Sequence, residues 1–210
     1  MSERCGFVHR FIPSPSRSDR VVLLLLHGTG GNEDDLLELG RELSPDASIL
    51  SPRGKVLENG APRFFRRLAE GVFDLEDVRF RAGELAAFIE CAVEEYQLAG
   101  AQVIAVGYSN GANIAAATML LHPGRIHAGA FFRAMVVLEP SPLPELSGSA
   151  VFISSGVMDP IVPASHVTRL AEIFCGAGAS VELKQQQASH GLVQSDIFDC
   201  RDWLARIVKR

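Results

Sequence analysis

The sequence predicts a single-domain α/β fold over residues 1–210, with a mostly parallel central sheet of about seven strands, helices on both faces and no large cap. Three observations support it. A chain of 210 residues has the usual size of one domain. Its composition, 47% hydrophobic and 21% charged, is that of a globular protein with a sizeable core. Apolar runs alternate along it with longer amphipathic segments, as in a parallel sheet covered by helices.

The strands are predicted from short apolar runs. The longest purely aliphatic run, Val21–Leu26, is one of them, and it is far shorter than the roughly 20 residues needed to cross a bilayer. The expected strands, in chain order, are Phe7–Ile12, Val21–Leu26, Ala47–Ser51, Gln102–Tyr108, Ala130–Leu138, Ala150–Ser154 and Ser180–Gln187.

The helices are predicted in the gaps between these strands. In the segment 79–98, apolar residues recur at spacings of three and four, which places them on one helical face that packs on the sheet. The expected helices are Glu33–Leu43, Arg79–Leu98, Asn110–Leu121, Pro163–Cys175 and Leu192–Val208.

The segment Pro52–Val78 has no clear periodicity but is apolar for a solvated loop. Long ordered loops often act as lids or binding walls, so Phe64 and Phe65 are predicted to line a substrate pocket. The alternative is that these rings only fill one side of the core.

Charge and cysteine content exclude several classes of protein. The formal net charge is -5 and there are no long basic runs, so nucleic acid is not an expected partner. The N-terminal 20 residues lack the apolar segment of a signal peptide, which predicts a cytoplasmic protein. The four cysteines form no CxxC pair, which argues against a metal knuckle, and most of them are expected to be reduced core residues.

The residues Gly107-Tyr108-Ser109-Asn110-Gly111 form a GxSxG motif between a predicted strand and a predicted helix. At such a junction the motif is typical of a nucleophile elbow, in which glycines permit a tight turn that exposes the serine oxygen at the helix N-terminus. Ser109 is therefore the predicted nucleophile. The alternative is that it merely caps the helix.

A serine nucleophile needs a base, and His190 is the candidate because it lies between the last predicted strand and the last predicted helix. Loops at that position reach the carboxyl edge of the sheet. The acid that orients the histidine precedes it in chain order in α/β-hydrolases, and Asp159, after the strand Ala150–Ser154, fits. Glu139 is the reserve candidate.

A glycine-rich loop, His27-Gly28-Thr29-Gly30-Gly31, follows the strand Val21–Leu26. Its glycines allow close approach to the nucleophile, so the backbone N–H groups of Thr29 and Asn110 are predicted to form an oxyanion hole. His27 then has a structural role in holding the loop. No phosphate-binding GxxxxGK[ST] or GxGxxG sequence is present.

With these motifs in order, the chain resembles the phospholipase/carboxylesterase family, which is related to dienelactone hydrolases and includes acyl-protein thioesterases. The resemblance extends from about Val21 to Trp203 and implies a cap-less α/β-hydrolase without metal or organic cofactor. It assigns nucleophile, acid and base to Ser109, Asp159 and His190. It also leaves a homodimer open, because members of the family are often dimeric.

The sequence is therefore interpreted as that of a carboxylic ester hydrolase acting on a small ester or thioester through an acyl-enzyme. Two alternatives remain at this point. One is a hydrolase of a ring-cleavage lactone, because the same nucleophile, base and oxyanion hole serve that reaction, although dienelactone hydrolases use a cysteine where this chain has Ser109. The other is a non-catalytic ligand-binding protein on the same fold.

Overall fold

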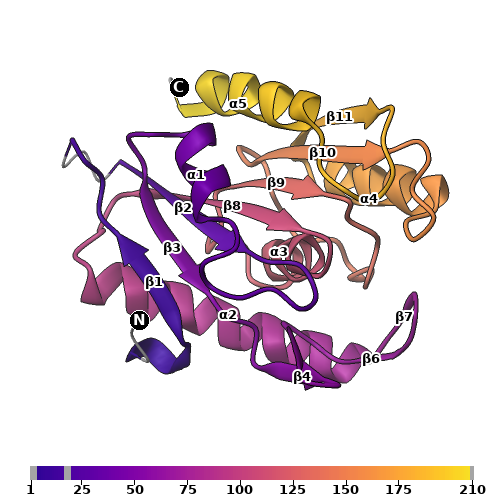
Figure 1. Cartoon of the computed structure of the whole chain (residues 1–210), viewed down its shortest axis with the longest axis horizontal. Coiled ribbons are helices and arrows are strands. Elements are labelled where there is room, and N and C mark those ends of the chain that lie inside the picture. The colour runs from indigo at the N-terminus through magenta and orange to yellow at the C-terminus, as the bar shows by residue number, and fades with distance from the viewer. Residues whose placement is uncertain (1–3, 17–19, 209–210) are drawn as a thin grey trace.

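The predicted parallel sheet forms the centre of the molecule (Figure 1). The computed structural model describes residues 4–16 and 20–208; residues 1–3, 17–19 and 209–210 of the predicted domain lie outside the described part. In the described part, seven strands pair in the order β1-β3-β2-β8-β9-β10-β11. Their bounds are β1 His9–Ile12, β2 Val21–Leu26, β3 Ser48–Pro52, β8 Gln102–Tyr108, β9 Ala128–Phe132, β10 Ala150–Gly156 and β11 Ser180–Gln186. Within this described seven-stranded sheet, only the pairing of β1 with β3 is antiparallel, so the prediction of a mostly parallel sheet is confirmed.

Strand β2 explains why the sheet is covered on both sides. All six of its residues are buried, and they alternate between two hydrophobic clusters. Val22, Leu24 and Leu26 pack into one cluster, while the intervening residues pack into the other. A continuous aliphatic run therefore gives a strand with no solvated face.

Helices cover the two faces of the sheet unequally. The first cluster contains side chains of α2 (Leu75–Glu95), α3 (Asn110–Leu121) and α4 (Ala164–Gly176). The second contains side chains of α1 (Leu37–Leu43) and α5 (Gln194–Val208), which lie side by side at the top of Figure 1. In the described ranges no helix combines the length and the apolar character that a membrane span requires.

Most predicted element bounds lie within a few residues of those observed, and the bounds of α3 coincide with them. Helix α2 begins four residues earlier than predicted because the Asp74 side chain accepts a hydrogen bond from the Asp77 backbone N–H at 3.1 Å. An aspartate N-cap of this kind satisfies one of the free N–H groups of the first turn. A short 3₁₀ turn, Arg4–Gly6, precedes β1.

The prediction of a strand over Ala130–Leu138 is wrong in its bounds. Strand β9 covers Ala128–Phe132 and ends where Arg133 takes a φ of 55°, a left-handed conformation that breaks the ladder. The apolar residues that follow, including Met135 and Leu138, are buried in an irregular segment. Burial therefore explains their apolar character without a strand.

The segment Pro52–Val78 contains two short hairpins, which the sequence analysis did not predict. One pairs β4 (Val56–Glu58) with β5 (Ala61–Arg63), and the other pairs β6 (Arg67–Ala69) with β7 (Val72–Phe73). The first turn is Asn59-Gly60, and both residues have positive φ, as a tight two-residue hairpin turn requires. Both hairpins lie near α2 at the bottom of Figure 1.

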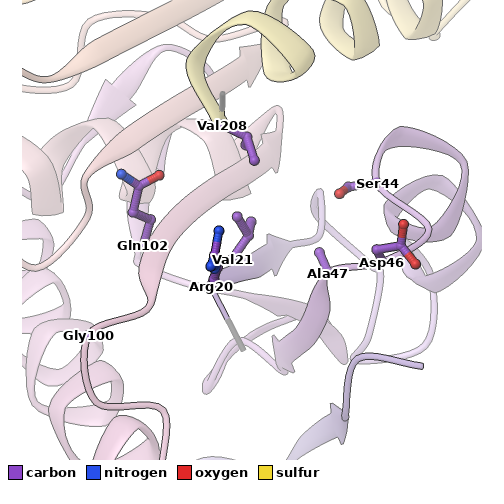
Figure 2. Close-up of a pocket in the computed structure, with 8 residues that line it drawn as sticks. All are labelled: Arg20, Val21, Ser44, Asp46, Ala47, Gly100, Gln102 and Val208. Atoms are coloured by element: carbon purple, nitrogen blue, oxygen red, sulfur yellow. The ribbon is translucent and has the colours of Figure 1, made fainter. Parts of the chain in front are cut away.

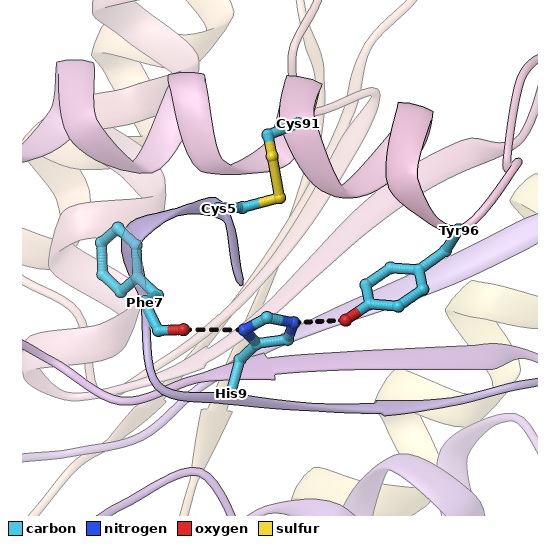
Figure 3. Close-up of a disulfide and its surroundings, with 5 residues drawn as sticks. All are labelled: Cys5, Phe7, His9, Cys91 and Tyr96. Atoms are coloured by element: carbon cyan, nitrogen blue, oxygen red, sulfur yellow. Dashed lines mark hydrogen bonds between the residues drawn. A yellow bond between two sulfur atoms is a disulfide. The ribbon is translucent and has the colours of Figure 1, made fainter. Parts of the chain in front are cut away.

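The prediction that most of the cysteines are reduced core residues is wrong, because Cys200 alone among the four is both free and buried. Cys5 and Cys91 form a disulfide between the 3₁₀ turn and α2, with 5.6 Å between their Cα atoms (Figure 3). Cys200 is buried and free, and Cys175 is free but exposed. The two bonded residues are 86 positions apart, so only the fold brings them together. Disulfides persist chiefly in oxidising compartments, so this bond does not support the predicted cytoplasmic location, which stays a prediction.

Next to the disulfide, His9 ties β1 to α2. One ring nitrogen donates to the Phe7 carbonyl at 2.8 Å and the other accepts from the Tyr96 hydroxyl at 2.6 Å (Figure 3). Tyr96 also stacks on Phe11, with 3.9 Å between ring centroids. These contacts, with the disulfide, fix the antiparallel edge of the sheet to the helix that covers it.

Candidate active site

The predicted site residues gather at the carboxyl edge of the sheet. Ser109 directly follows β8, Asp159 lies after β10, and His190 lies between β11 and α5. Thr29 follows β2, which pairs with β8 through Leu26 and Gly107. Because these strands are parallel, the loops after them meet at one edge.

Ser109 has the strained backbone of a nucleophile elbow. Its φ is 52° and its ψ is -114°, a conformation that costs a non-glycine residue of the order of 1–3 kcal/mol. A Cβ on Gly107 would lie 2.6 Å from backbone atoms of Ala112, and one on Gly111 would lie 1.9 Å from the Leu26 carbonyl oxygen. Both glycines of the GxSxG motif are therefore required by close packing of backbone.

His190 makes hydrogen bonds to both of its predicted partners. Its Nε2 lies 3.0 Å from Ser109 Oγ, and its Nδ1 lies 2.8 Å from Asp159 Oδ2. The other Asp159 oxygen accepts from the backbone N–H groups of Ile161 (2.8 Å) and Val162 (3.1 Å). Because the carboxylate only accepts, Nδ1 donates to it, which leaves Nε2 free to accept the serine proton.

The reserve candidate, Glu139, lies elsewhere. Its carboxylate forms an exposed ion pair with Arg169, with the shortest contact at 2.6 Å. This guanidinium holds the pKa of Glu139 below its ordinary value, chiefly through the side-chain hydrogen bond. The structure therefore pairs His190 with Asp159 and leaves Glu139 on the surface.

Thr29 and Asn110 line the same cavity as Ser109. Among the described residues, none accepts a hydrogen bond from the backbone N–H of either, so both N–H groups are free to donate to another group. The Asn110 side chain is buried, and its Oδ1 accepts from the Phe64 backbone N–H at 2.7 Å. Its Nδ2 is buried without an acceptor in the described part of the chain.

His27 has the structural contacts expected of it. Its Nδ1 donates to the Gly28 carbonyl at 2.6 Å, and its Nε2 accepts from the Gly54 backbone N–H at 2.9 Å. Burial lowers the pKa of His27, which favours the neutral ring that these two bonds need. The ring thus joins the glycine-rich loop to the segment that leads into the first hairpin.

The prediction that Phe64 and Phe65 line the pocket differs from the structure. Both are buried, at 3% and 0% exposure, and neither is among the side chains that line the cavity around Ser109. The Phe64 ring packs against His27 and the Phe65 ring packs edge-on against Phe73. Large aromatic rings gain most from complete burial, and of these three only Phe73 reaches the cavity.

The cavity around Ser109 has a volume of about 350 Å³. Its lining combines Ser109 and His190 with apolar side chains, among them Phe73, Met135 and Ile161, and with charged side chains from both hairpins. The lining residues are Thr29, Arg63, Arg67, Glu70, Gly71, Phe73, Tyr108, Ser109, Asn110, Asn113, Met135, Ile161 and His190. A hollow of this size accommodates a small organic molecule.

A second hollow, of about 470 Å³, opens at the opposite edge of the sheet (Figure 2). Its lining includes Val21 and Gln102, the first residues of β2 and β8, and Val208 at the end of α5. It therefore lies at the amino ends of the strands and is separate from the cavity around Ser109.

Arg133, which was not predicted from the sequence, holds the backbone on both sides of His190. Its guanidinium is fully buried and donates to the carbonyls of Ser189 (3.1 Å) and Gly191 (2.8 Å). Two of its nitrogens also form a bidentate ion pair with the buried Asp196 at 2.7 and 2.9 Å. A lone charged residue inside an apolar run is the sequence signal that could have found it.

Tyr108 adds a further restraint on this loop. Its hydroxyl donates to the His190 carbonyl at 3.1 Å, and its ring packs 5.5 Å from the imidazole, centroid to centroid. Burial raises the pKa of Tyr108, so the hydroxyl stays protonated and able to donate at neutral pH. The position of His190 is thus set by contacts from β8 and from the end of β9.

Comparison with known proteins gives consistent matches over nearly the whole chain. The model of the family described as Phospholipase/Carboxylesterase matches residues 8–208. The chain is 46% identical to the putative hydrolase MhqD of Bacillus subtilis, over 87% of this chain and 91% of the relative.

Solved structures are similar to this chain over most of its length. The crystal structure of a Bacillus cereus carboxylesterase is similar, with a TM-score of 0.91 and 40% identity over 94% of this chain and 93% of that one. A structure of YahD with malic acid is similar with a TM-score of 0.87 and 31% identity, covering 94% and 98% of the two chains.

Proposed function

The chain belongs to the phospholipase/carboxylesterase family of hydrolases, and from this premise we propose that it is a serine esterase that cleaves small carboxylic esters through an acyl-enzyme. The observation that carries the proposal is the hydrogen-bonded chain from Ser109 Oγ through His190 to Asp159, with contacts of 3.0 and 2.8 Å. A neutral serine hydroxyl is a weak nucleophile, and an adjacent oriented base is what activates it.

In the proposed first step, Ser109 Oγ attacks the ester carbonyl carbon while His190 Nε2 takes the hydroxyl proton. The carbonyl oxygen becomes an oxyanion, which accepts from the backbone N–H groups of Thr29 and Asn110. Collapse of this intermediate breaks the bond to the alcohol, and the imidazolium returns the proton to the departing oxygen. Asp159 keeps the imidazole in the correct tautomer and stabilises its positive charge.

In the second step, water replaces the alcohol. His190 removes a proton from the water, the hydroxide attacks the acyl-serine, and the same two N–H groups stabilise the second oxyanion. The free acid leaves and Ser109 recovers its proton. In measured cases, removing one oxyanion donor raises the activation free energy by about 3–4 kcal/mol, so these two N–H groups account for a large part of the rate.

The size of the cavity favours small substrates. A volume of about 350 Å³ must hold the acyl group together with the reacting carbonyl, and its apolar wall comes from Phe73, Met135 and Ile161. Burial of each methylene contributes about 0.8 kcal/mol until the pocket is full. YahD, the relative solved with malic acid, holds a molecule in this size range.

We expect the wild-type protein to hydrolyse ethyl and 4-nitrophenyl esters, with kcat/KM that rises with acyl length from about two to eight carbons and then levels off. Thioesters and lactones belong in the same panel. The Ser109→Ala variant is the control, and it should lose hydrolysis of every ester that the wild type accepts. Continued hydrolysis by this variant would contradict the proposal, and a rise continuing to palmitoyl esters would contradict the size limit.

A further inference from the structure

We propose that Arg63 and Arg67 form a carboxylate-binding subsite in this cavity, so that the substrate is a small ester with a second, anionic carboxyl group. The inference rests on the proposed function, because it names the substrate class of the same site. Both arginines line the cavity that contains Ser109 and His190. Guanidinium groups bind carboxylates through paired, charge-assisted hydrogen bonds.

Arg63 is held rigidly beside the predicted oxyanion hole. The residue is 3% exposed, and its Nε donates to the Phe65 carbonyl at 3.2 Å. Its Nη1 donates to Thr29 Oγ1 at 2.7 Å and lies 3.2 Å from a Glu58 carboxylate oxygen. In the described part of the chain, no residue accepts from its Nη2. Arg63 therefore has an unused N–H donor at Nη2. Its guanidinium also contacts Thr29, whose backbone N–H is proposed to bind the reacting carbonyl.

Arg67 offers further unused donors. Only its Nε is used, donating to the two carboxylate oxygens of Glu58 at 2.9 and 3.2 Å. Within the ranges that the structure describes, nothing accepts from its Nη1 or Nη2. Its side chain is 32% exposed, so these terminal nitrogens remain accessible to a ligand. A guanidinium fixed at one end and free at the other suits recognition of a carboxylate.

The local charge balance also favours an anion. One carboxylate, Glu58, serves both Arg63 and Arg67, which leaves an excess positive charge at this side of the cavity. Glu70 also lines the cavity, but it is exposed at the turn between β6 and β7, where water screens its charge. The neighbouring Arg66 is used elsewhere, in ion pairs with Asp74 and Asp77.

A further unsatisfied donor lies in the same cavity lining. Asn110 is 3% exposed and its Nδ2 is buried without an acceptor among the described residues. Its Oδ1 accepts from the Phe64 backbone N–H, which fixes the orientation of the amide. A buried donor without a partner destabilises the free protein. The cavity therefore has a surplus of N–H donors, while its apolar wall suits a short methylene chain.

The test compares two esters that differ only in charge. Monoethyl adipate carries a carboxylate at the far end of its acyl chain, and ethyl adipamate carries a neutral amide of the same shape. Hydrolysis is followed by ethanol release. We expect wild-type kcat/KM to be about tenfold higher or more for the anionic ester, as one charge-assisted hydrogen bond supplies. The preference should decrease as sodium chloride is raised.

Substitutions then test which residues cause the preference for the anionic ester. Arg67→Gln should reduce it about fivefold to tenfold, mainly by raising KM for the anionic ester. Glu70→Gln should raise it about twofold, because it removes a like charge from the same cavity. A purely structural disturbance would not change the preference in opposite directions. Arg206→Gln is the matched control, since Arg206 is an exposed arginine paired with Glu182 on another part of the surface, and it should leave the preference unchanged.

Equal or faster hydrolysis of the neutral ester by the wild type would overturn the subsite while leaving the esterase proposal intact, and so would a preference that survives Arg67→Gln. Binding tests the subsite independently of turnover. Calorimetric titration of Ser109→Ala with adipate should show binding that Arg67→Gln weakens about tenfold. If neither ester is hydrolysed, this titration still tests the subsite. Absence of adipate binding overturns the subsite, and binding that depends on Arg67 supports it.

Discussion

Replacing His190 with alanine is expected to lower kcat for ester hydrolysis by about 10⁴- to 10⁶-fold. The variant loses the only imidazole that hydrogen-bonds Ser109 in the described structure, so no base takes the hydroxyl proton. KM should change little, because the loss concerns the transition state more than substrate binding. The measurement is steady-state hydrolysis of a 4-nitrophenyl ester by purified wild type and variant.

His122→Ala is the matched control. His122 lies directly after α3, the helix that begins at Asn110, so it is about 18 Å from Ser109 along this helix. It should keep wild-type activity. Comparable losses in the two variants would show that stability of the fold, and not base catalysis, explains the effect. Near-normal activity of His190→Ala would contradict the mechanism.

Asp159→Asn is expected to lower kcat by about 10³- to 10⁴-fold without unfolding the protein. An amide can donate where the carboxylate only accepts, so the imidazole is no longer held with its proton on Nδ1. The two backbone N–H groups of Ile161 and Val162 can still donate to the Asn oxygen, which preserves the loop. Activity and the thermal unfolding midpoint should be measured together to separate these effects.

Glu139→Gln gives the comparison for this prediction. It removes a carboxylate that lies after the preceding strand and is paired with Arg169 at the surface. An exposed ion pair contributes little to stability, and activity should stay within about twofold of the wild type. If Glu139→Gln is the inactive variant and Asp159→Asn is active, the acid is misassigned.

The central elements of the fold could be predicted because their burial leaves a local signal. Strand β2 is aliphatic throughout since both of its faces are covered. Helix α3 begins directly after Ser109, within the GxSxG motif whose two glycines are required by close backbone packing. The irregular segment after Arg133 gave the same apolar signal as a strand, because burial and not hydrogen bonding selects its residues. Apolar character alone does not distinguish the two.

The order of the motifs predicted the triad residues, but the contacts that hold these residues in place could not be predicted from the sequence. Arg133 and Asp196 are 63 positions apart, and the link between Arg63 and Thr29 spans 34 positions. Such pairs depend on the three-dimensional arrangement of loops, which a single sequence does not encode locally. The disulfide was missed for the same reason, since Cys5 and Cys91 share no spacing motif.

The central claim is that Ser109 is an activated nucleophile, and covalent labelling tests it most directly. Intact mass of the folded protein should be measured after exposure to a fluorophosphonate, with wild type and Ser109→Ala side by side. An activated serine beside an oxyanion hole attacks such a reagent rapidly, so the wild type should gain the mass of one phosphonyl group and the variant none. No gain in the wild type, or the same gain in Ser109→Ala, would contradict the account.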